Sequence, residues 1–206
     1  MSSRQRPSAA AALLAALLLA PAGCATAPGT AAAPADADAD ATAAAAILER
    51  FATPTAGIHA GGRIAADDLP ALRDAGIRHV IDLSTDAETP DFDEGAAARA
   101  AGLGYDHLPI AGAADLTPAS VAAFDQLLRG VEGPALVHCA SGNRVGALAA
   151  LRAAWLHGAD EDAAIAEGRR WGLRSLEGEV RTRLARERCL ADARDPDAIA
   201  RCAAGG

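Results

Sequence analysis

A short apolar run that changes abruptly into a helical pattern limits what this chain can fold into more than any other feature. Residues Ala135 to Val137 predict a short buried strand, and from Arg144 onward the apolar residues recur at helical spacing. The residues between them therefore form a strand-to-helix turn, with Cys139 at its start. Turns of this kind are where α/β folds place their ligands.

The turn favours a negative charge at Cys139. Backbone N–H groups and the positive end of the helix dipole point into a turn that opens a helix, and both favour an anion or a thiolate there. Arg144 follows closely, and a cysteine in an electropositive turn can act as a nucleophile. Gly142 lacks a Cβ, so the loop can approach a bound group closely. A buried structural cysteine beside a helix cap is the alternative interpretation.

The motif His138-Cys139-x-x-Gly142-x-Arg144 resembles the active-site loop of the cysteine-dependent protein tyrosine and dual-specificity phosphatases. It is most similar to their bacterial branch, the β-lactamase-hydrolase-like phosphatases. Weaker upstream matches include Gly61-Gly62-Arg63, Val80-Ile81-Asp82-Leu83 and Tyr105-Asp106-His107-Leu108-Pro109-Ile110, and the resemblance covers roughly residues 56–157. It implies hydrolysis of a phosphate monoester, or of another anionic substrate, through a thiophosphate-cysteine intermediate and without a cofactor.

The resemblance also implies roles for individual residues. Cys139 is the nucleophile, and Arg144 holds two oxygens of the phosphate with its planar guanidinium. The phosphate-binding loop then consists of His138, Ala140, Ser141, Gly142, Asn143 and Arg144. Within it, Ser141 assists release of the intermediate and Asn143 shapes the loop. His138 fixes the loop by hydrogen bonding or is merely a buried structural histidine.

The general acid is expected in the loop after Leu108-Pro109-Ile110, where dual-specificity phosphatases place an aspartate. Gly112 occupies the usual position here, so Asp115 is the candidate acid. Its rival role is to stabilise the start of the following helix. Asp86 and Glu88, after the preceding strand, are further candidates for the wall of the pocket or simply belong to a solvated loop.

The spacing of the loop leaves other reactions open. Arg144 stands five positions after Cys139, whereas the phosphatase signature has its arginine at six, where Val145 stands. Loops of this shorter length are similar to those of rhodanese-type sulfurtransferases, whose N–H groups hold a persulfide. A sulfurtransferase with a persulfide on Cys139 is therefore one alternative, and a catalytically inactive anion-binding module is another.

Composition narrows the function further. The 206 residues are 51% hydrophobic and 22% charged, which suits one ordinary domain with appended segments. All 19 basic residues are arginine, so Schiff-base lysine chemistry and a Walker-type lysine are excluded. A net charge of −8 without a basic stretch argues against nucleic acid as a partner.

Strands and helices alternate along the chain. Strands are predicted at 57–60, 79–83 and 105–110, and a fourth strand ends at Cys139. Helices are predicted at 47–52, 67–75, 117–130, 144–157, 160–171 and 176–187, and a further helix ends at Ala101. Alternation at such short spacing predicts a single α/β domain with a mostly parallel central sheet flanked by helices.

The first 24 residues resemble an export signal. Arg4 and Arg6 precede an apolar stretch at 9–20 that is too short to span a membrane. Ala22-Gly23-Cys24 resembles a lipobox with Cys24 as the lipid-bearing residue, although Pro21 stands where leucine is usual. Ordinary signal-peptidase cleavage and an uncleaved apolar helix are the alternatives. We expect a periplasmic protein that contacts the membrane only through its lipid.

The remaining segments complete the predicted organisation. Residues 25–45, rich in Ala, Pro and Asp, are predicted to be a disordered tether, 46–188 the catalytic domain and 189–206 a tail. Cys189 and Cys202 can pair in an oxidising compartment and leave Cys139 free, or can stay reduced. No metal is expected, because the sequence lacks Cys-x2-Cys and His-x3-His spacings.

Overall fold

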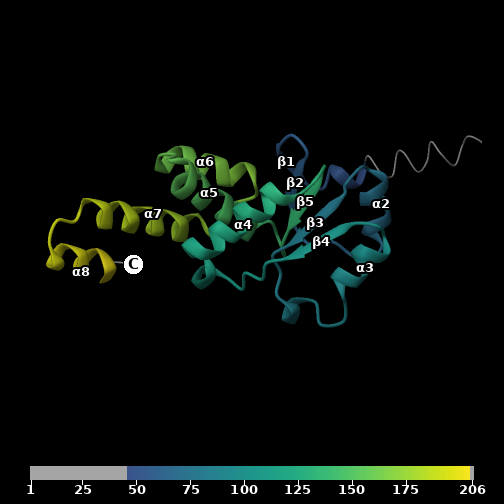
Figure 1. The fold of residues 1–206 in the computed structure, drawn as a ribbon, viewed down its shortest axis with the longest axis horizontal. Helices are drawn as coiled ribbons and strands as arrows, with labels where there is room; N and C mark the ends of the chain where they lie inside the picture. The colour runs from purple at the N-terminus through teal and green to yellow at the C-terminus, as the bar shows by residue number, and fades with distance from the viewer. Residues whose placement is uncertain (1–45, 205–206) are drawn as a thin grey trace, which may run out of the picture. The chain divides into compact units, whose positions relative to one another are not determined.

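The sheet is built around a strand that is buried at every position. In the computed structural model, which describes residues 46–204, the strands are β1 (Ala52–Thr55), β2 (Ile58–Gly61), β3 (His79–Asp82), β4 (Gly104–His107) and β5 (Ala135–His138) (Figure 1). They lie in the order β1-β2-β5-β3-β4. Only the β1–β2 pair is antiparallel. The apolar run of β5 is continuous because both faces of a parallel sheet are covered.

Helices cover both faces of this sheet. They are α2 (Asp68–Asp74), α3 (Glu94–Ala100), α4 (Pro118–Gly130), α5 (Asn143–His157), α6 (Glu161–Arg170), α7 (Glu177–Asp192) and α8 (Pro196–Ala204), with short 3-10 helices η1 (Asp86–Glu88) and η2 (Ala113–Asp115). In Figure 1, α2 and α3 lie on one side of the strands, and α4, α5 and α6 on the other. The fold is a single α/β domain with a mostly parallel sheet, as the sequence predicts.

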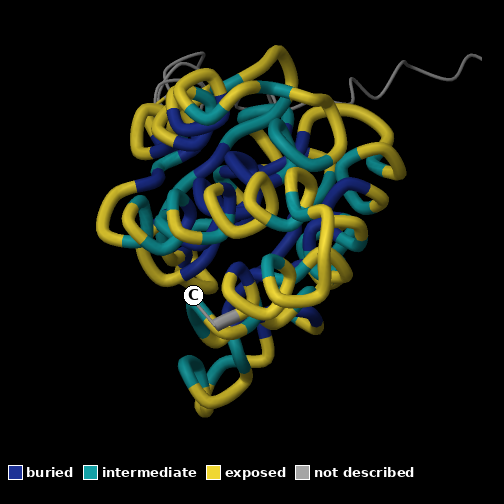
Figure 2. The backbone as a smooth tube through the Cα atoms, turned by 90° about the vertical axis from the view of Figure 1, so that its left-hand side faces the viewer, coloured by how far each residue is buried: buried dark blue, intermediate teal, exposed yellow. Residues whose placement is uncertain are grey.

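The two sides of the sheet have separate apolar cores, and β5 contributes to both. Leu136 packs with residues of α2 and α3, whereas Val137 and Cys139 pack with residues of α4, α5 and α6. Figure 2 shows the buried segments gathered in the interior. Because successive side chains of a strand point to opposite faces, His138 faces the α2–α3 side while Cys139 faces the α5 side.

Two regions differ from the sequence prediction. A strand, β1, follows the helical turn at 46–48 where a helix was expected up to residue 52. The helix predicted at 176–187 is also longer than expected, because α7 continues to Asp192, and a further helix, α8, lies in the segment predicted as a tail at 189–206. Asp195 accepts a hydrogen bond from the Ala198 N–H and Pro196 opens α8, which is a helix-start pattern that the sequence analysis overlooked.

Cys189 of α7 and Cys202 of α8 form a disulfide in the structure, and Cys139 is a free, buried thiol. The proposed export signal, the lipobox with Cys24 and the tether at 25–45 lie outside the described residues. Among residues 46–204, no helix is both long enough and apolar enough to cross a bilayer.

The packing of α5 on α6 makes a testable prediction at Gly146. A Cβ there would lie 2.6 Å from Leu173 Cα and 2.7 Å from the Gly168 carbonyl oxygen. We expect Gly146→Ala to lower the free energy of unfolding by about 1–3 kcal/mol, because the crowded groups are backbone atoms that cannot rotate away.

Gly178→Ala in α7 is the matched control. No atom lies within 4 Å of its added Cβ, so this change should stabilise the protein by about 0.5–1 kcal/mol. Urea unfolding measures both variants. Equal effects of the two substitutions would contradict the close approach of α5 and α6.

Candidate active site

The predicted loop lies where the carboxyl ends of three parallel strands meet. In the sheet, His138 of β5 is in register with Gly61 of β2 on one side and with Asp82 of β3 on the other. The chain leaves β5 at Cys139, turns through Gly142 and enters α5 at Asn143. The loop therefore lies at the start of a long helix, as the sequence predicts, and the structure places it at the middle of the sheet.

The segment after β2 supports the loop from outside. The Cys139 N–H donates to the Gly61 carbonyl (3.3 Å), the Arg63 N–H donates to the Ala140 carbonyl (3.4 Å), and Gly62 pairs with Ser141 as an antiparallel bridge. Ala140 and Ser141 are exposed at the rim. These backbone contacts hold the loop at Cys139, Ala140 and Ser141 against the segment that follows β2.

Gly142 makes the turn into α5 possible. Its φ of 81° lies in the left-handed region, and an added Cβ would lie 3.3 Å from Gly61 backbone atoms. The same residue donates its N–H to Cys139 Sγ at 3.2 Å. A glycine at this position thus places an amide hydrogen directly on the sulfur.

Cys139 has no exposed surface in the structure. The residue packs in the apolar core, while its sulfur accepts the Gly142 N–H and is near enough to Arg144 to help raise the pKa of that guanidinium. The sulfur is therefore not enclosed by apolar atoms alone. It lies at the boundary between the core and the polar loop.

Arg144 points inward and is fully engaged along one end. Nη1 and Nη2 donate to the two carboxylate oxygens of Glu88 at 2.7 and 2.6 Å, and Nη1 also donates to the Ile110 carbonyl. An arginine has five N–H donors. The Nε–H and the second Nη2–H share the edge that these three bonds leave free. That edge has the geometry for two oxygens of a tetrahedral anion.

Glu88 is positioned by its own turn. The Thr85 N–H and hydroxyl both donate to Glu88 Oε1, which closes a capping box around η1. Hydrogen bonds from Arg144, reinforced by those from Thr85, lower the pKa of Glu88 from 4.5 to about 2 although burial opposes this. Glu88 in turn raises the pKa of Arg144, and the adjacent Cys139 sulfur adds to that effect.

His138 lies on the opposite side of the sheet from the sulfur. Its Nε2 is 2.7 Å from Glu94 Oε1 and 3.7 Å from Asp82 Oδ1, and all three side chains are buried. His138 thus hydrogen-bonds to Glu94 of α3, and the Asp82 carboxylate lies nearby at an ion-pair distance. The sequence analysis did not connect either carboxylate with it.

The other predicted loop residues have separate contacts. Asn143 accepts hydrogen bonds from the Arg174 and Leu176 N–H groups and donates to Ser175 Oγ, so it joins the start of α5 to the segment after α6. The predicted acid, Asp115, is half-buried, and its carboxylate accepts a hydrogen bond from the Ala111 N–H at 2.7 Å. Its loop begins at Ile110, whose carbonyl contacts Arg144.

Glu88 is the site residue whose role the sequence concealed. The sequence analysis named it only as part of a pocket wall, together with Asp86, whose side chain is almost wholly exposed. The Thr85-x-x-Glu88 pattern signals a capping box, and this pattern could have located the turn. It carries no information about a partner 56 residues away.

Comparison with known proteins identifies the family of the chain. The family model described as "Beta-lactamase hydrolase-like protein, phosphatase-like domain" matches residues 50–155, just over half of the chain. A Beta-lactamase hydrolase-like protein of Xylella fastidiosa is 38% identical over 94 residues, which are 44% of this chain and 22% of that relative. The chain thus corresponds to about a fifth of the length of such curated relatives.

Two solved structures share the fold. A protein from Neisseria meningitidis assigned as a phosphatase superposes with a TM-score of 0.55 at 22% identity, covering 64% of this chain and 96% of its own. One from Shewanella putrefaciens, also assigned as a phosphatase, has a TM-score of 0.50 at 21% identity and covers 69% and 97%. At these identities the likeness establishes the fold.

The Glu88–Arg144 pair makes a prediction about acid stability. The pKa of Glu88 is lower in the folded state, so the pair contributes its full stability above about pH 4.5 and loses it as pH falls towards 2. We expect Glu88→Gln to be less stable than the wild type at pH 7 by about 2 kcal/mol, and to lose less stability between pH 4.5 and 2.5.

Urea unfolding at several pH values measures this difference. Asp162→Asn, which changes a carboxylate whose side chain is 97% exposed, is the control and should retain the wild-type pH profile. A parallel loss of stability in the wild type and Glu88→Gln would show that the pair is not formed in solution.

Proposed function

Because the chain belongs to the family of Beta-lactamase hydrolase-like protein phosphatase-like domains, we propose that it is a cysteine-dependent phosphatase acting on phosphate monoesters. One observation carries the proposal. Arg144 is fixed by Glu88 and Ile110 with one bidentate edge left free, and its guanidinium lies beside a cysteine sulfur that receives a loop N–H. This combination suits a nucleophile and an anion clamp that act on the same group.

In the proposed reaction, the Cys139 thiolate attacks phosphorus, so that an S–P bond forms while the bond to the ester oxygen breaks. The free edge of Arg144 and the loop N–H groups stabilise the negative charge on the equatorial oxygens. Water then attacks phosphorus, the S–P bond breaks, and inorganic phosphate leaves with Cys139 restored. We assign Ser141, at the exposed rim of the loop, to the release of the intermediate.

We assign Asp115 as the donor of the proton to the leaving oxygen. Support comes from its position in the loop that starts at Ile110, beside Arg144. The carboxylate accepts a hydrogen bond from Ala111, so it must leave this contact to reach a substrate. Movements of active-site loops are common in enzymes that close over their substrates.

Sulfur transfer is the second candidate. It is favoured by the five-residue spacing between Cys139 and Arg144 and by the engagement of the Asp115 carboxylate with its own loop. A sulfurtransferase would take a sulfane sulfur from a donor such as thiosulfate onto Cys139 and pass it to a thiophilic acceptor. This reaction requires no general acid.

One pair of assays separates the candidates. Hydrolysis of para-nitrophenyl phosphate and sulfur transfer from thiosulfate to cyanide are measured for the wild type, Cys139→Ser and Arg144→Lys. We expect phosphate release by the wild type, a loss of at least about 10³-fold in Cys139→Ser, and about 10²-fold or more in Arg144→Lys because lysine lacks the bidentate edge. Asp115→Asn should lose more activity on phenyl phosphate than on para-nitrophenyl phosphate, because the phenolate leaving group depends more strongly on protonation.

Other outcomes would overturn the assignment. Cys139-dependent turnover in the cyanide assay alone would identify a sulfurtransferase. Phosphate or vanadate binding with an unchanged affinity in Cys139→Ser, and no turnover in either assay, would identify an anion-binding module.

We further propose that the domain is exported and carries a lipid on Cys24. The support is the sequence alone: a basic start, an apolar stretch and the Ala22-Gly23-Cys24 motif. In bacteria expressing the full chain, radiolabelled palmitate should label the wild type and not Cys24→Ala, and the wild type should fractionate with membranes. Wild-type protein that carries no palmitate label and is released into the periplasm would instead indicate ordinary signal-peptidase cleavage.

A further inference from the structure

A second cluster of reactive side chains lies on the other face of the sheet from Cys139. Asp82, Glu94 and His138 each offer a donor atom, and these three atoms lie within 4.8 Å of one another. The relative exposures of the three residues are 4%, 4% and 0%. We propose that this cluster is a binding site for a divalent transition-metal ion.

The donor set selects the kind of ion. One imidazole nitrogen and two carboxylate oxygens suit Zn²⁺ or Mn²⁺, whereas Mg²⁺ and Ca²⁺ prefer oxygen ligands alone. Two ligands of a tetrahedral zinc ion lie about 3.4 Å apart. His138 Nε2 is 3.7 Å from Asp82 Oδ1, which fits this spacing. The 2.7 Å contact to Glu94 is a hydrogen bond, and an ion would replace its proton after a small rotation of the glutamate.

Other groups orient the ligands as a metal site requires. The Ser84 N–H donates to Asp82 Oδ1 at 2.7 Å and the Tyr105 hydroxyl donates to Asp82 Oδ2 at 3.1 Å. Supporting hydrogen bonds of this kind fix the direction of a coordinating carboxylate.

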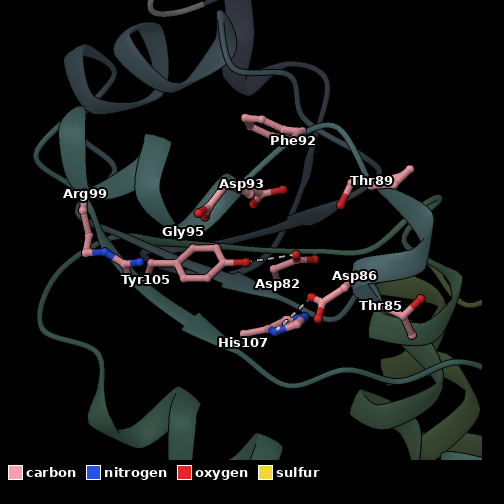
Figure 3. A pocket seen from close by; sticks show the side chains of 12 residues that line it. Asp82, Thr85, Asp86, Thr89, Phe92, Asp93, Gly95, Arg99, Tyr105 and His107 are labelled. Carbon is pink, nitrogen blue, oxygen red and sulfur yellow. Dashed lines mark hydrogen bonds and ion pairs between the residues drawn. The ribbon is translucent and has the colours of Figure 1, made fainter.

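Two of the three proposed ligands reach a cavity. Its volume is about 400 Å³, and Asp82 and Glu94 belong to its lining. Figure 3 shows Tyr105, Asp82 and Asp93 around its interior, with Asp86 and His107 near one edge. A site with three protein ligands and an open side can complete its coordination with water or a small anion.

The charge balance of the cavity also favours a cation. Four carboxylates line it, those of Asp82, Asp86, Asp93 and Glu94, against one guanidinium, that of Arg99. Arg99 lies over the ring of Tyr105, with its guanidinium carbon 5.9 Å from the ring centre. Two of the carboxylates, those of Asp82 and Glu94, are buried, and a single imidazole, that of His138, lies between them.

The site is separate from the proposed phosphatase chemistry. His138 precedes Cys139, but the two side chains point to opposite faces of the sheet, and the Thr85–Glu88 turn stands between the cavity and Arg144. The metal proposal can therefore be tested independently of the proposed hydrolysis, and the failure of one would not affect the other. Sequence spacing predicts no metal here, because the three ligands come from β3, α3 and β5 and form no local motif.

Metal titration of the full chain tests the proposal. After dialysis against a chelator and then metal-free buffer, Mn²⁺ is added and its free concentration is followed by electron paramagnetic resonance. We expect one bound Mn²⁺ per chain. We also expect Zn²⁺ at 100-fold excess over its dissociation constant to raise the melting temperature by about 5 °C or more.

Variants assign the binding to the cluster. Glu94→Gln and Asp82→Asn should each weaken Mn²⁺ binding at least about 10-fold, since each removes a charged ligand. Asp106→Asn is the matched control: Asp106 also pairs with a histidine, His79 at 2.8 Å, but belongs to no three-ligand cluster, so binding should be unchanged. Cys139→Ser should retain binding as well.

Three results would overturn the proposal. The first is the absence of Mn²⁺ and Zn²⁺ binding at 1 mM, a concentration about 100-fold above the dissociation constant of a site of modest affinity. The second is equal weakening by Glu94→Gln and Asp106→Asn, which would indicate non-specific binding to acidic residues. The third is loss of binding in Cys139→Ser alone, which would place the ion at the thiol.

Discussion

The arrangement of the site depends on one buried guanidinium. Arg144 is only 8% exposed, and a buried cation that lacks partners destabilises a protein by several kcal/mol. Glu88 from the turn after β3 and the Ile110 carbonyl from the loop after β4 supply those partners. Satisfying this one charge therefore links the turn after β3 and the loop after β4 to the start of α5.

The peptide between His138 and Cys139 connects two chemical environments. On the α5 side the sulfur receives an amide hydrogen and lies beside a guanidinium, which is a setting for anions. On the α3 side the imidazole meets two buried carboxylates, which is a setting for cations. The alternation of a single strand separates them, so two sites of opposite charge preference are one residue apart in the sequence.

Local signals account for the parts that the sequence predicted well. The apolar run at 135–137, the caps at Thr117 and Asp160, and the glycine at 142 specify strands, helix starts and the turn through interactions among neighbours. The loop motif within them indicated the family that the comparisons establish. α8 was missed although its start is also local, because Asp195 and Pro196 were not recognised as a cap.

By itself, then, the sequence determined the α/β class and the strand-to-helix turn that carries Cys139, since each depends on periodicity or on contacts within a few residues. Only the tertiary structure decided which carboxylate faces which cation. Glu88 and Glu94 stand six residues apart in similar polar surroundings, yet one binds Arg144 and the other His138. That choice follows from where the tertiary structure places η1 and the start of α3, the first beside the start of α5 and the second beside β5 on the other side of the sheet.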